Sequence, residues 1–312
     1  MIKRIQLLVV LLIFLFIFDF AKNIREGGII HKTLSYSAEQ NSSSDCNSLS
    51  NCTPIFSSAL ILPTPTLGIP ENKITENVPV DEKINAPVQN DYCLTVPVLT
   101  YHRIQPQSIA VEKNQTAGSV DNEIFDQQMA YLSSSGYSTI TAEELINALR
   151  NHTGLPAKSV VITLDDGYEN AYTYAYLIAQ KYQIKLNLMI ATGLVGNQDF
   201  LIWDQIKEMR NSGLVYFTNH TWSHYAVGNG SYEKIQYEIQ TAKGQLEQYT
   251  GQTINIFTYP YGSFSPNAIQ ILQQDGFIGG FSTIPGKVQC ESYIMTLHRT
   301  SIGNSPLSSY GL

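Results

Sequence analysis

The stretch VVITLDDGYENAY, residues 160–172, joins a strand to a pair of acids. Residues 160–164 are apolar or β-branched, which is typical of a buried strand. Two adjacent carboxylates, Asp165 and Asp166, follow directly, and Gly167 comes next. Because neighbouring acids repel each other, the pair indicates one of two things. It is either a solvated turn or a metal site in which one acid binds the ion and the other handles a proton.

Strands and helices alternate along the chain around this stretch. The expected strands are 93–104, 138–141, 159–164, 185–192, 214–220, 254–260, 277–283 and 293–302. The expected helices are 122–137, 141–151, 169–182, 201–213, 231–251 and 265–276. This alternation with short loops is typical of a parallel α/β fold, and about seven repeats favour a distorted (β/α) barrel over an open sheet. In such a barrel, chemistry lies at the carboxyl ends of the strands.

The first 90 residues have a different character. Residues 1–20 place Lys3 and Arg4 before an apolar run, which indicates a signal anchor or a signal peptide. Residues 21–90 are rich in Ser, Asn, Thr and Pro without a sustained period, which predicts a disordered stalk. We therefore expect a catalytic domain over 91–312, either anchored at the extracellular face of the membrane or secreted.

The net charge limits the kinds of binding partner, and the cysteine content indicates the cellular compartment. The net charge of −7 gives no basic surface for nucleic acid and is neutral towards uncharged sugars. Four cysteines fit an exported protein. They allow three pairings, of which Cys46–Cys52 with Cys93–Cys290 is geometrically attractive, and free thiols are the alternative.

A second polar cluster follows the expected strand 214–220. His220 and His224, in HTWSH, can face one metal ion if the segment turns helically. With one carboxylate they would form the open three-ligand set common for Zn²⁺, Fe²⁺ or Co²⁺, and the spare aspartate would be a general base. Each motif alone is more often a turn or surface feature. Because the aspartate pair and the histidine pair both follow strands of the same fold, a shared metal site is favoured.

A third element is FTYPYGSFSP, residues 257–266. Pro260 and Gly262 fix a turn after a strand, so Tyr261 can present its backbone N–H to a developing oxyanion. A plain turn is the alternative.

These three motifs together resemble a known family. TLDDGY, HTWSH and YPYG, in this order and at these separations, are similar to the first three motifs of the polysaccharide deacetylases, the NodB-homology carbohydrate esterases. The resemblance covers roughly residues 92–312. PVLTYHRI, FDQQMAYLSSSGY and LIWDQIKEMRNSG look most like the biofilm branch, which removes acetyl groups from poly-β-1,6-N-acetylglucosamine.

The resemblance implies a distorted (β/α) barrel and a role for each motif residue. Asp165 would be the general base. Asp166, His220 and His224 would hold a divalent metal ion, Zn²⁺ first, with Co²⁺, Ni²⁺ or Fe²⁺ as alternatives. Tyr261 would supply the oxyanion N–H.

Two departures from the family pattern affect the remaining roles. Thr258 stands where the family's third motif has an arginine that orients the base, and Arg299 could take over that role. The general acid is His102 of the first strand, as in the biofilm branch, or His298. We favour His102, because a histidine beside a needed arginine points away on an alternating strand. The family's fourth motif is not recognisable in GGFSTIPG, residues 279–286.

The sequence thus predicts an exported, metal-dependent N-deacetylase, a hydrolase of linear amide C–N bonds. Its expected partners are a polysaccharide, most simply poly-β-1,6-N-acetylglucosamine, and the membrane through residues 1–20. Peptidoglycan, chitin oligomers and acetylxylan are alternative substrates. An inactive carbohydrate-binding module of the same fold is the alternative outside enzymes. No Gly-x-Ser-x-Gly elbow supports a serine esterase.

Overall fold

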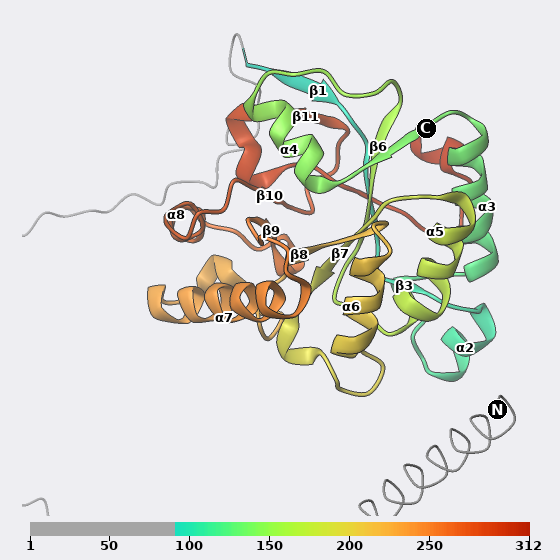
Figure 1. The fold of residues 1–312 in the computed structure, drawn as a ribbon, viewed down its shortest axis with the longest axis horizontal. Helices are drawn as coiled ribbons and strands as arrows, with labels where there is room; N and C mark the ends of the chain where they lie inside the picture. Colours follow the sequence, from blue (N-terminus) through green and yellow to red (C-terminus); the bar gives the residue numbers. More distant parts are fainter. Residues whose placement is uncertain (1–90) are drawn as a thin grey trace, which may run out of the picture. The chain divides into compact units, whose positions relative to one another are not determined.

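A computed structural model describes residues 91–312 (Figure 1). The central sheet has the strand order β10-β9-β8-β7-β6-β2-β12, and β5 also pairs with β6. Its strands are β2 (Val98–Tyr101), β5 (Ser138–Ile140), β6 (Ser159–Leu164), β7 (Leu186–Ile190), β8 (Val215–Asn219), β9 (Ile256–Thr258), β10 (Gly279–Phe281) and β12 (Thr300–Ser301). Every strand pair in it is parallel. The sheet curls into a half-barrel, which confirms the expected distorted (β/α) barrel of about seven strands.

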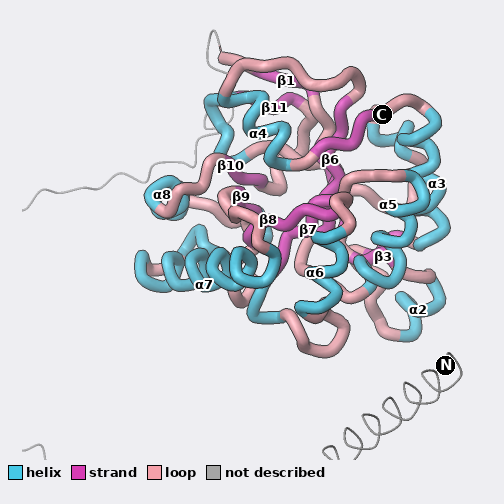
Figure 2. Tube along the Cα trace, in the orientation of Figure 1, coloured by secondary structure: helices cyan, strands magenta, loops and turns pink. Residues whose placement is uncertain are grey.

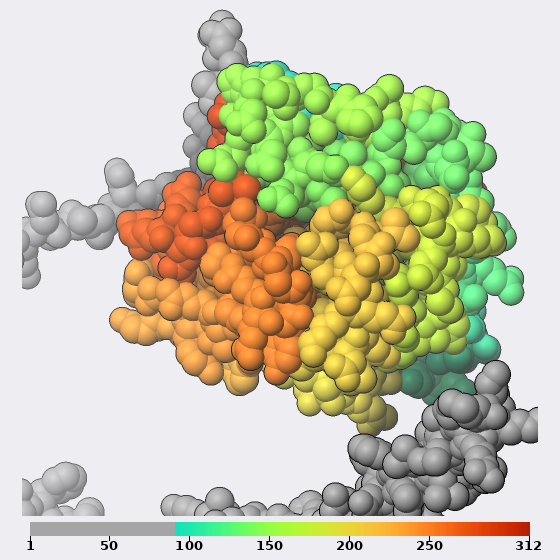
Figure 3. Space-filling model, in the orientation of Figure 1, coloured from blue at the N-terminus to red at the C-terminus, as the bar shows by residue number. Residues whose placement is uncertain are grey.

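Helices surround this sheet (Figure 2). They are α2 (Gln107–Glu112), α3 (Asn122–Ser134), α4 (Ala142–Arg150), α5 (Leu177–Tyr182), α6 (Trp203–Asn211), α7 (Tyr232–Thr250) and α8 (Pro266–Gln274). Local signals set their ends: Thr141 and Glu144 form a capping box before α4, and α7 ends at Gly251 with a left-handed φ of 64°. On the face shown in Figure 3, the side chains of α4, α6 and α7 cover the strands.

The quoted stretch forms the centre of the core, because all six residues of β6 are buried. Val160, Ile162 and Leu164 belong to one apolar cluster, and Val161 belongs to a second one. This division follows from the period of two along a strand buried on both faces. The buried strand holds the two acids that follow it in a fixed place.

A disulfide joins the start of the described chain to β11. β1 (Cys93–Thr95) pairs antiparallel with β11 (Val288–Cys290), and Cys93 is opposite Cys290. These cysteines form a disulfide with Cα atoms 4.1 Å apart. Cys46 and Cys52 lie outside the described residues.

Two of the expected strands are interrupted or mostly replaced in the structure. The expected strand 93–104 is divided into β1, β2 and β3 (Arg103–Ile104), and β3 pairs with β4 (Ser119–Val120). Pro97 separates β1 from β2, since proline has no amide proton for a sheet ladder. Most of the expected strand 293–302 is also lost. Residues 291–296 form helical turns held in part by a hydrogen bond from the Tyr293 hydroxyl to the Val288 carbonyl.

The expected segments 1–20 and 21–90 lie outside the described residues. Within residues 91–312, no helix combines the length and the apolar character that crossing a membrane requires.

Candidate active site

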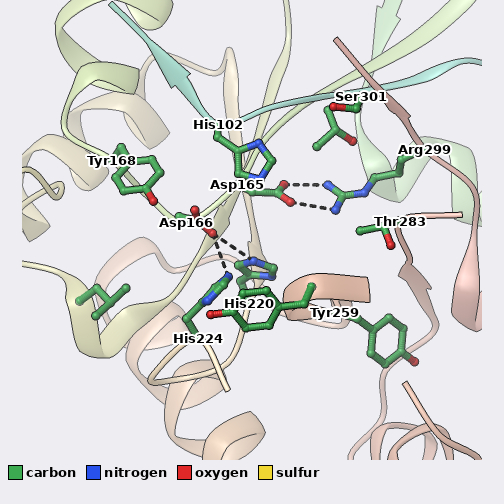
Figure 4. Close-up of a pocket in the computed structure, with 13 residues that line it drawn as sticks. His102, Asp165, Asp166, Tyr168, His220, His224, Tyr259, Thr283, Arg299 and Ser301 are labelled. Carbon is green, nitrogen blue, oxygen red and sulfur yellow. Dashed lines mark hydrogen bonds and ion pairs between the residues drawn. The ribbon is translucent and has the colours of Figure 1, made fainter. Parts of the chain in front are cut away.

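A cavity of about 520 Å³ opens at the carboxyl ends of the central strands (Figure 4). Residues that follow β2, β6, β8, β9 and β10 converge on it. Its lining consists of Thr100, His102, Asp165, Asp166, Tyr168, Leu194, His220, His224, Tyr259, Tyr261, Thr283, Arg299 and Ser301. The structure therefore brings seven of the eight sequence-predicted site residues to one cavity; the exception is His298.

Asp166, His220 and His224 form one compact group. The Oδ1 atom of Asp166 lies 3.4 Å from Nε2 of His220 and 3.0 Å from Nε2 of His224. One ligand atom from each residue falls within 4.8 Å of the others. Two imidazoles and one carboxylate at this spacing can hold a single metal ion and leave further positions open.

The hydrogen bonds of this group fit a metal ion. Nδ1 of His220 donates to the backbone carbonyl of Thr258 over 2.8 Å, so Nε2 carries the free lone pair. Oδ1 of Asp166 is buried and has no hydrogen-bond donor among the described residues. Burial would raise the pKa of Asp166, but the two imidazoles outweigh it and the pKa is lowered. An ionised oxygen without a donor faces two imidazole nitrogens, which is the arrangement that a bound cation completes.

The HTWSH segment reaches this geometry as a loop, without the helical turn that was the stated condition for the two histidines to face one ion. Thr221 and His224 adopt left-handed backbone conformations, with φ of 66° and 59°. The imidazole rings of His220 and His224 meet edge to face with centroids 4.9 Å apart. Asp166 itself has a φ of 75°. Such conformations cost free energy in residues other than glycine and cluster at functional sites.

Asp165 has a different partner. Arg299 donates two parallel hydrogen bonds, from Nη1 to Oδ1 over 2.7 Å and from Nη2 to Oδ2 over 2.8 Å. Burial would raise the pKa of Asp165, but the charge and hydrogen bonds of Arg299 lower it. Thr258, at the family's arginine position, contributes its carbonyl to His220 instead.

The guanidinium of Arg299 is fixed by further contacts. Its Nε donates to the Ser282 carbonyl over 2.8 Å, and Nη1 also lies 3.2 Å from Oγ1 of Thr163. The residue is only 3% exposed. A buried, bidentate arginine of this kind restricts both the charge and the orientation of its carboxylate.

The two candidate acids lie in different places. His102 follows β2 and lines the cavity beside Asp165 (Figure 4). His298 does not line it: its ring stacks on Tyr293 with centroids 4.6 Å apart, and burial lowers its pKa.

Tyr261 lies over the metal group at the mouth of the cavity. Its ring contacts His224 with centroids 4.6 Å apart and is 73% exposed. The left-handed φ of 59° turns its backbone, and its amide makes no hydrogen bond within residues 91–312. The amide is thus free to bind a ligand oxygen.

Sequence reasoning missed several lining residues. Thr100, Leu194, Thr283 and Ser301 carry no motif signal, because only the curl of the sheet brings them to the cavity, and Tyr259 begins the YPYG motif but was given no role. Tyr168, in TLDDGY, was predicted only as a residue that stacks on a sugar or packs within the protein, and it does line the cavity. Its hydroxyl faces Asp166, and its ring packs under the guanidinium of Arg103, 3.4 Å from the ring centre.

The sequence pattern of the family described as Polysaccharide deacetylase matches residues 152–279, which contain both aspartates, both histidines and the Tyr261 turn. Over these residues the chain matches the polysaccharide deacetylase family. It is accordingly a hydrolase of the polysaccharide deacetylase class, and the expected family resemblance is confirmed.

Relatives of this deacetylase occur in several bacteria. A Bacillus subtilis protein named as polysaccharide deacetylase YxkH is 26% identical over 75% of this chain and 80% of its own length. Poly-β-1,6-N-acetyl-D-glucosamine N-deacetylases of Escherichia coli and Staphylococcus aureus are 25% and 26% identical, over 67% and 59% of this chain. The alignments span 36% of the E. coli enzyme and 70% of the S. aureus enzyme.

Solved structures show the same fold. The Streptococcus pyogenes deacetylase PplD in complex with acetate has a TM-score of 0.63 at 29% identity, over 68% of this chain and 94% of that one. IcaB from Ammonifex degensii has a TM-score of 0.60 at 27% identity, over 70% of this chain and 94% of that one.

Proposed function

We propose that this deacetylase removes N-acetyl groups from an extracellular N-acetylglucosamine polymer, with poly-β-1,6-N-acetylglucosamine as the substrate. The observation that carries the chemistry is the side-by-side placement of the Asp165–Arg299 pair and the Asp166–His220–His224 group in one cavity. The names of the E. coli and S. aureus relatives support the choice of polymer.

Asp166, His220 and His224 would hold the metal ion. A donor set of two imidazoles and one carboxylate suits Zn²⁺ first, and Co²⁺, Ni²⁺ or Fe²⁺ next. When bound, such an ion acts as a Lewis acid that polarises the amide carbonyl and acidifies water.

The side chains around this group would carry the proton transfers. Asp165 accepts a proton from water as the water oxygen forms its bond to the amide carbon. The backbone N–H of Tyr261 donates to the oxyanion that develops on the former carbonyl oxygen. His102 then donates a proton to the nitrogen as the C–N bond breaks. The products are acetate and a glucosamine unit with a free amine.

His102 is preferred to His298 as the acid because of its position. It lines the cavity beside Asp165, whereas the ring of His298 stacks on Tyr293. An acid must reach the leaving nitrogen, directly or through one water, to protonate it.

We also propose that the protein acts outside the cell, held by residues 1–20 or released. The disulfide between Cys93 and Cys290 supports this, since disulfides persist in oxidising compartments. The apolar N-terminal run after Lys3 and Arg4 supports export by the same route.

Acetate release by the purified full-length protein tests the proposal. The substrates are matched oligomers of β-1,6-linked N-acetylglucosamine, chitin oligomers, peptidoglycan fragments and acetylxylan. Each is assayed after chelation and again after Zn²⁺, Co²⁺ or Ni²⁺ is added. We expect acetate from the β-1,6-linked oligomer when metal is present, and none from the Asp165→Asn variant.

The other outcomes separate the alternatives. Release from only chitin, peptidoglycan or xylan would keep the site and replace the polymer. If metal binds but no substrate yields acetate, the chain is a binding module that retains the site, and the proposal is wrong.

A further inference from the structure

Helix α7 carries a buried carboxylate that the proposed chemistry does not use. Glu238 is 0% exposed. Its Oε2 accepts the backbone N–H of Ser223 over 2.7 Å, and Oε1 accepts the Ser223 hydroxyl over 2.7 Å. Nζ of Lys234 lies 2.7 Å from the same Oε1. A charge buried this deeply persists only where hydrogen bonds and a counter-charge satisfy it, so these contacts are specific.

These contacts fall on the segment that carries the metal group. Ser223 directly precedes His224, whose φ of 59° is left-handed, as is that of Thr221 at 66°. Residues held in such conformations need surroundings that over-determine them. Asn219 accepts the amide of Thr221 through Oδ1 over 2.8 Å, and Oγ1 of Thr221 accepts the amide of Tyr225 over 2.8 Å.

Among the groups that hold the backbone around His224, the carboxylate of Glu238 is the charged one. It binds both the amide and the hydroxyl of one residue, so it fixes the position of Ser223 and its orientation together. Burial would raise the pKa of Glu238, but Lys234 and the Ser223 donors lower it. The group is therefore ionised at neutral pH, and both oxygens can accept hydrogen bonds.

We propose that Glu238 is a positioning residue that sets the affinity of the metal group. By clamping Ser223, it holds the strained backbone of His224 so that Nε2 stays at the distance from Asp166 at which both can bind one ion. Without the clamp, His224 would relax towards an ordinary backbone conformation and its imidazole would leave the group. The inference rests on the metal site of the proposed function.

The direct test is the Zn²⁺ dissociation constant of the full-length protein, measured by competition with a chromophoric chelator. Glu238→Gln keeps the size of the side chain but replaces one acceptor oxygen with a donor NH₂ that faces another donor. We expect Zn²⁺ to bind about tenfold more weakly, the lower end of the range typical of residues that orient metal ligands.

The helix offers a matched control in Glu247→Gln. Glu247 also accepts a backbone amide, from Ile254 over 3.0 Å, and also pairs with a lysine four residues earlier, Lys243. It differs in that its side chain is 36% exposed and that it binds Ile254 instead of the segment between the two histidines. We expect both variants to lower the melting temperature without metal, and only Glu238→Gln to weaken Zn²⁺ binding.

A second variant keeps the test decisive if Glu238→Gln does not fold. Ser223 is exposed, so Ser223→Ala removes one of the two bonds with little effect on the core. It should weaken Zn²⁺ binding by a smaller factor than Glu238→Gln. Wild-type affinity in both Glu238→Gln and Ser223→Ala, or equal weakening in Glu247→Gln, would overturn the inference and leave the proposed function standing. A wild-type protein that binds no metal would contradict both this inference and the proposed function.

Discussion

The cavity has two halves, each built on one of two adjacent aspartates. The carboxylate of Asp165 is satisfied within the protein, because Arg299 donates a hydrogen bond to each of its two oxygens. Asp166 is incomplete, because its buried Oδ1 has no hydrogen-bond donor and faces two imidazole nitrogens. Neighbouring residues of one type thus acquire different chemistry from their partners alone: one needs no ligand, and the other is satisfied by a cation.

Backbone geometry separates the two halves. Asp165 directly follows β6, and its carboxylate points to Arg299, which directly precedes β12 (Figure 4). The left-handed φ of 75° at Asp166 turns the chain, so its side chain faces the segment after β8. Gly167 completes the turn with a φ of 81°, where an added Cβ would lie 3.1 Å from Ile190.

The largest expected effect on activity comes from removing a ligand of the Asp166–His220–His224 group. Asp166→Ala removes the only carboxylate of the ligand set, so acetate release should fall to the uncatalysed background. Metal at 100 times its dissociation constant should stabilise the wild-type fold by about 2.7 kcal/mol, and should not stabilise the variant. Melting curves with and without Zn²⁺ check this. Equal stabilisation of both proteins would mean that the ion binds elsewhere.

Asp165→Asn should lower the catalytic rate without affecting metal binding. Loss of a general base lowers kcat by about 10²- to 10⁴-fold, while the metal ligands stay in place. Steady-state kinetics and a Zn²⁺ titration on the same preparation measure both quantities. A variant that keeps more than a tenth of the wild-type kcat would show that another group accepts the proton.

Arg299→Gln should move the pH profile as well as the rate. Arg299 lowers the pKa of Asp165; without it, burial raises that pKa, so Asp165 is ionised only at higher pH. The acid limb of kcat/KM should therefore shift to higher pH.

The same variant should cost stability, by about 3–5 kcal/mol, because it leaves a buried carboxylate unpaired. That loss should be greatest at neutral pH and shrink as acid protonates Asp165. Arg299→Lys retains the charge without the two-pronged contact and should shift the acid limb less. An unmoved acid limb in Arg299→Gln would contradict the pairing.

The smallest effect is expected from Tyr168→Phe. The Tyr168 hydroxyl faces Asp166, and burial together with the Asp166 charge raises its pKa to about 12, so it is a neutral donor at neutral pH. Removing one such hydrogen bond costs about 1 kcal/mol, or roughly fivefold in Zn²⁺ affinity. A loss as large as that of Asp166→Ala would mean that Tyr168 is itself a ligand.

The sequence predicted the parts of this comparison that lie in contiguous motifs. Asp165 and Asp166 follow an unmistakable buried strand, and HTWSH places two histidines within five residues of each other. The parallel barrel was also predictable, because the repeats alternate regularly. Arg299 was predicted only through the family resemblance, because the family has an arginine where this sequence has Thr258; the residue lies 134 positions from Asp165.

Other features depend on tertiary packing and left no signal in the sequence. Glu238 lies on the buried face of α7 with Ile235 and Ile239, but its partner Ser223 is in a loop 15 residues earlier, so the sequence does not show the contact. The left-handed turns at Thr221 and His224 oppose local preference, so the two histidines approach each other without the helical turn that was the condition stated from their spacing. The strand ends near Pro97 and Tyr293 differed for local reasons: Pro97 has no amide proton for the sheet ladder, and the Tyr293 hydroxyl binds the carbonyl of Val288, five residues earlier.

The most direct test of the two-halves account is a Zn²⁺ titration of Asp165→Asn beside Asp166→Asn, with acetate release measured on the same samples. We predict that Asp165→Asn binds Zn²⁺ with wild-type affinity and releases no acetate, whereas Asp166→Asn binds Zn²⁺ far more weakly. Equal loss of Zn²⁺ binding in the two variants would show that both aspartates hold the ion, and would contradict the division of roles.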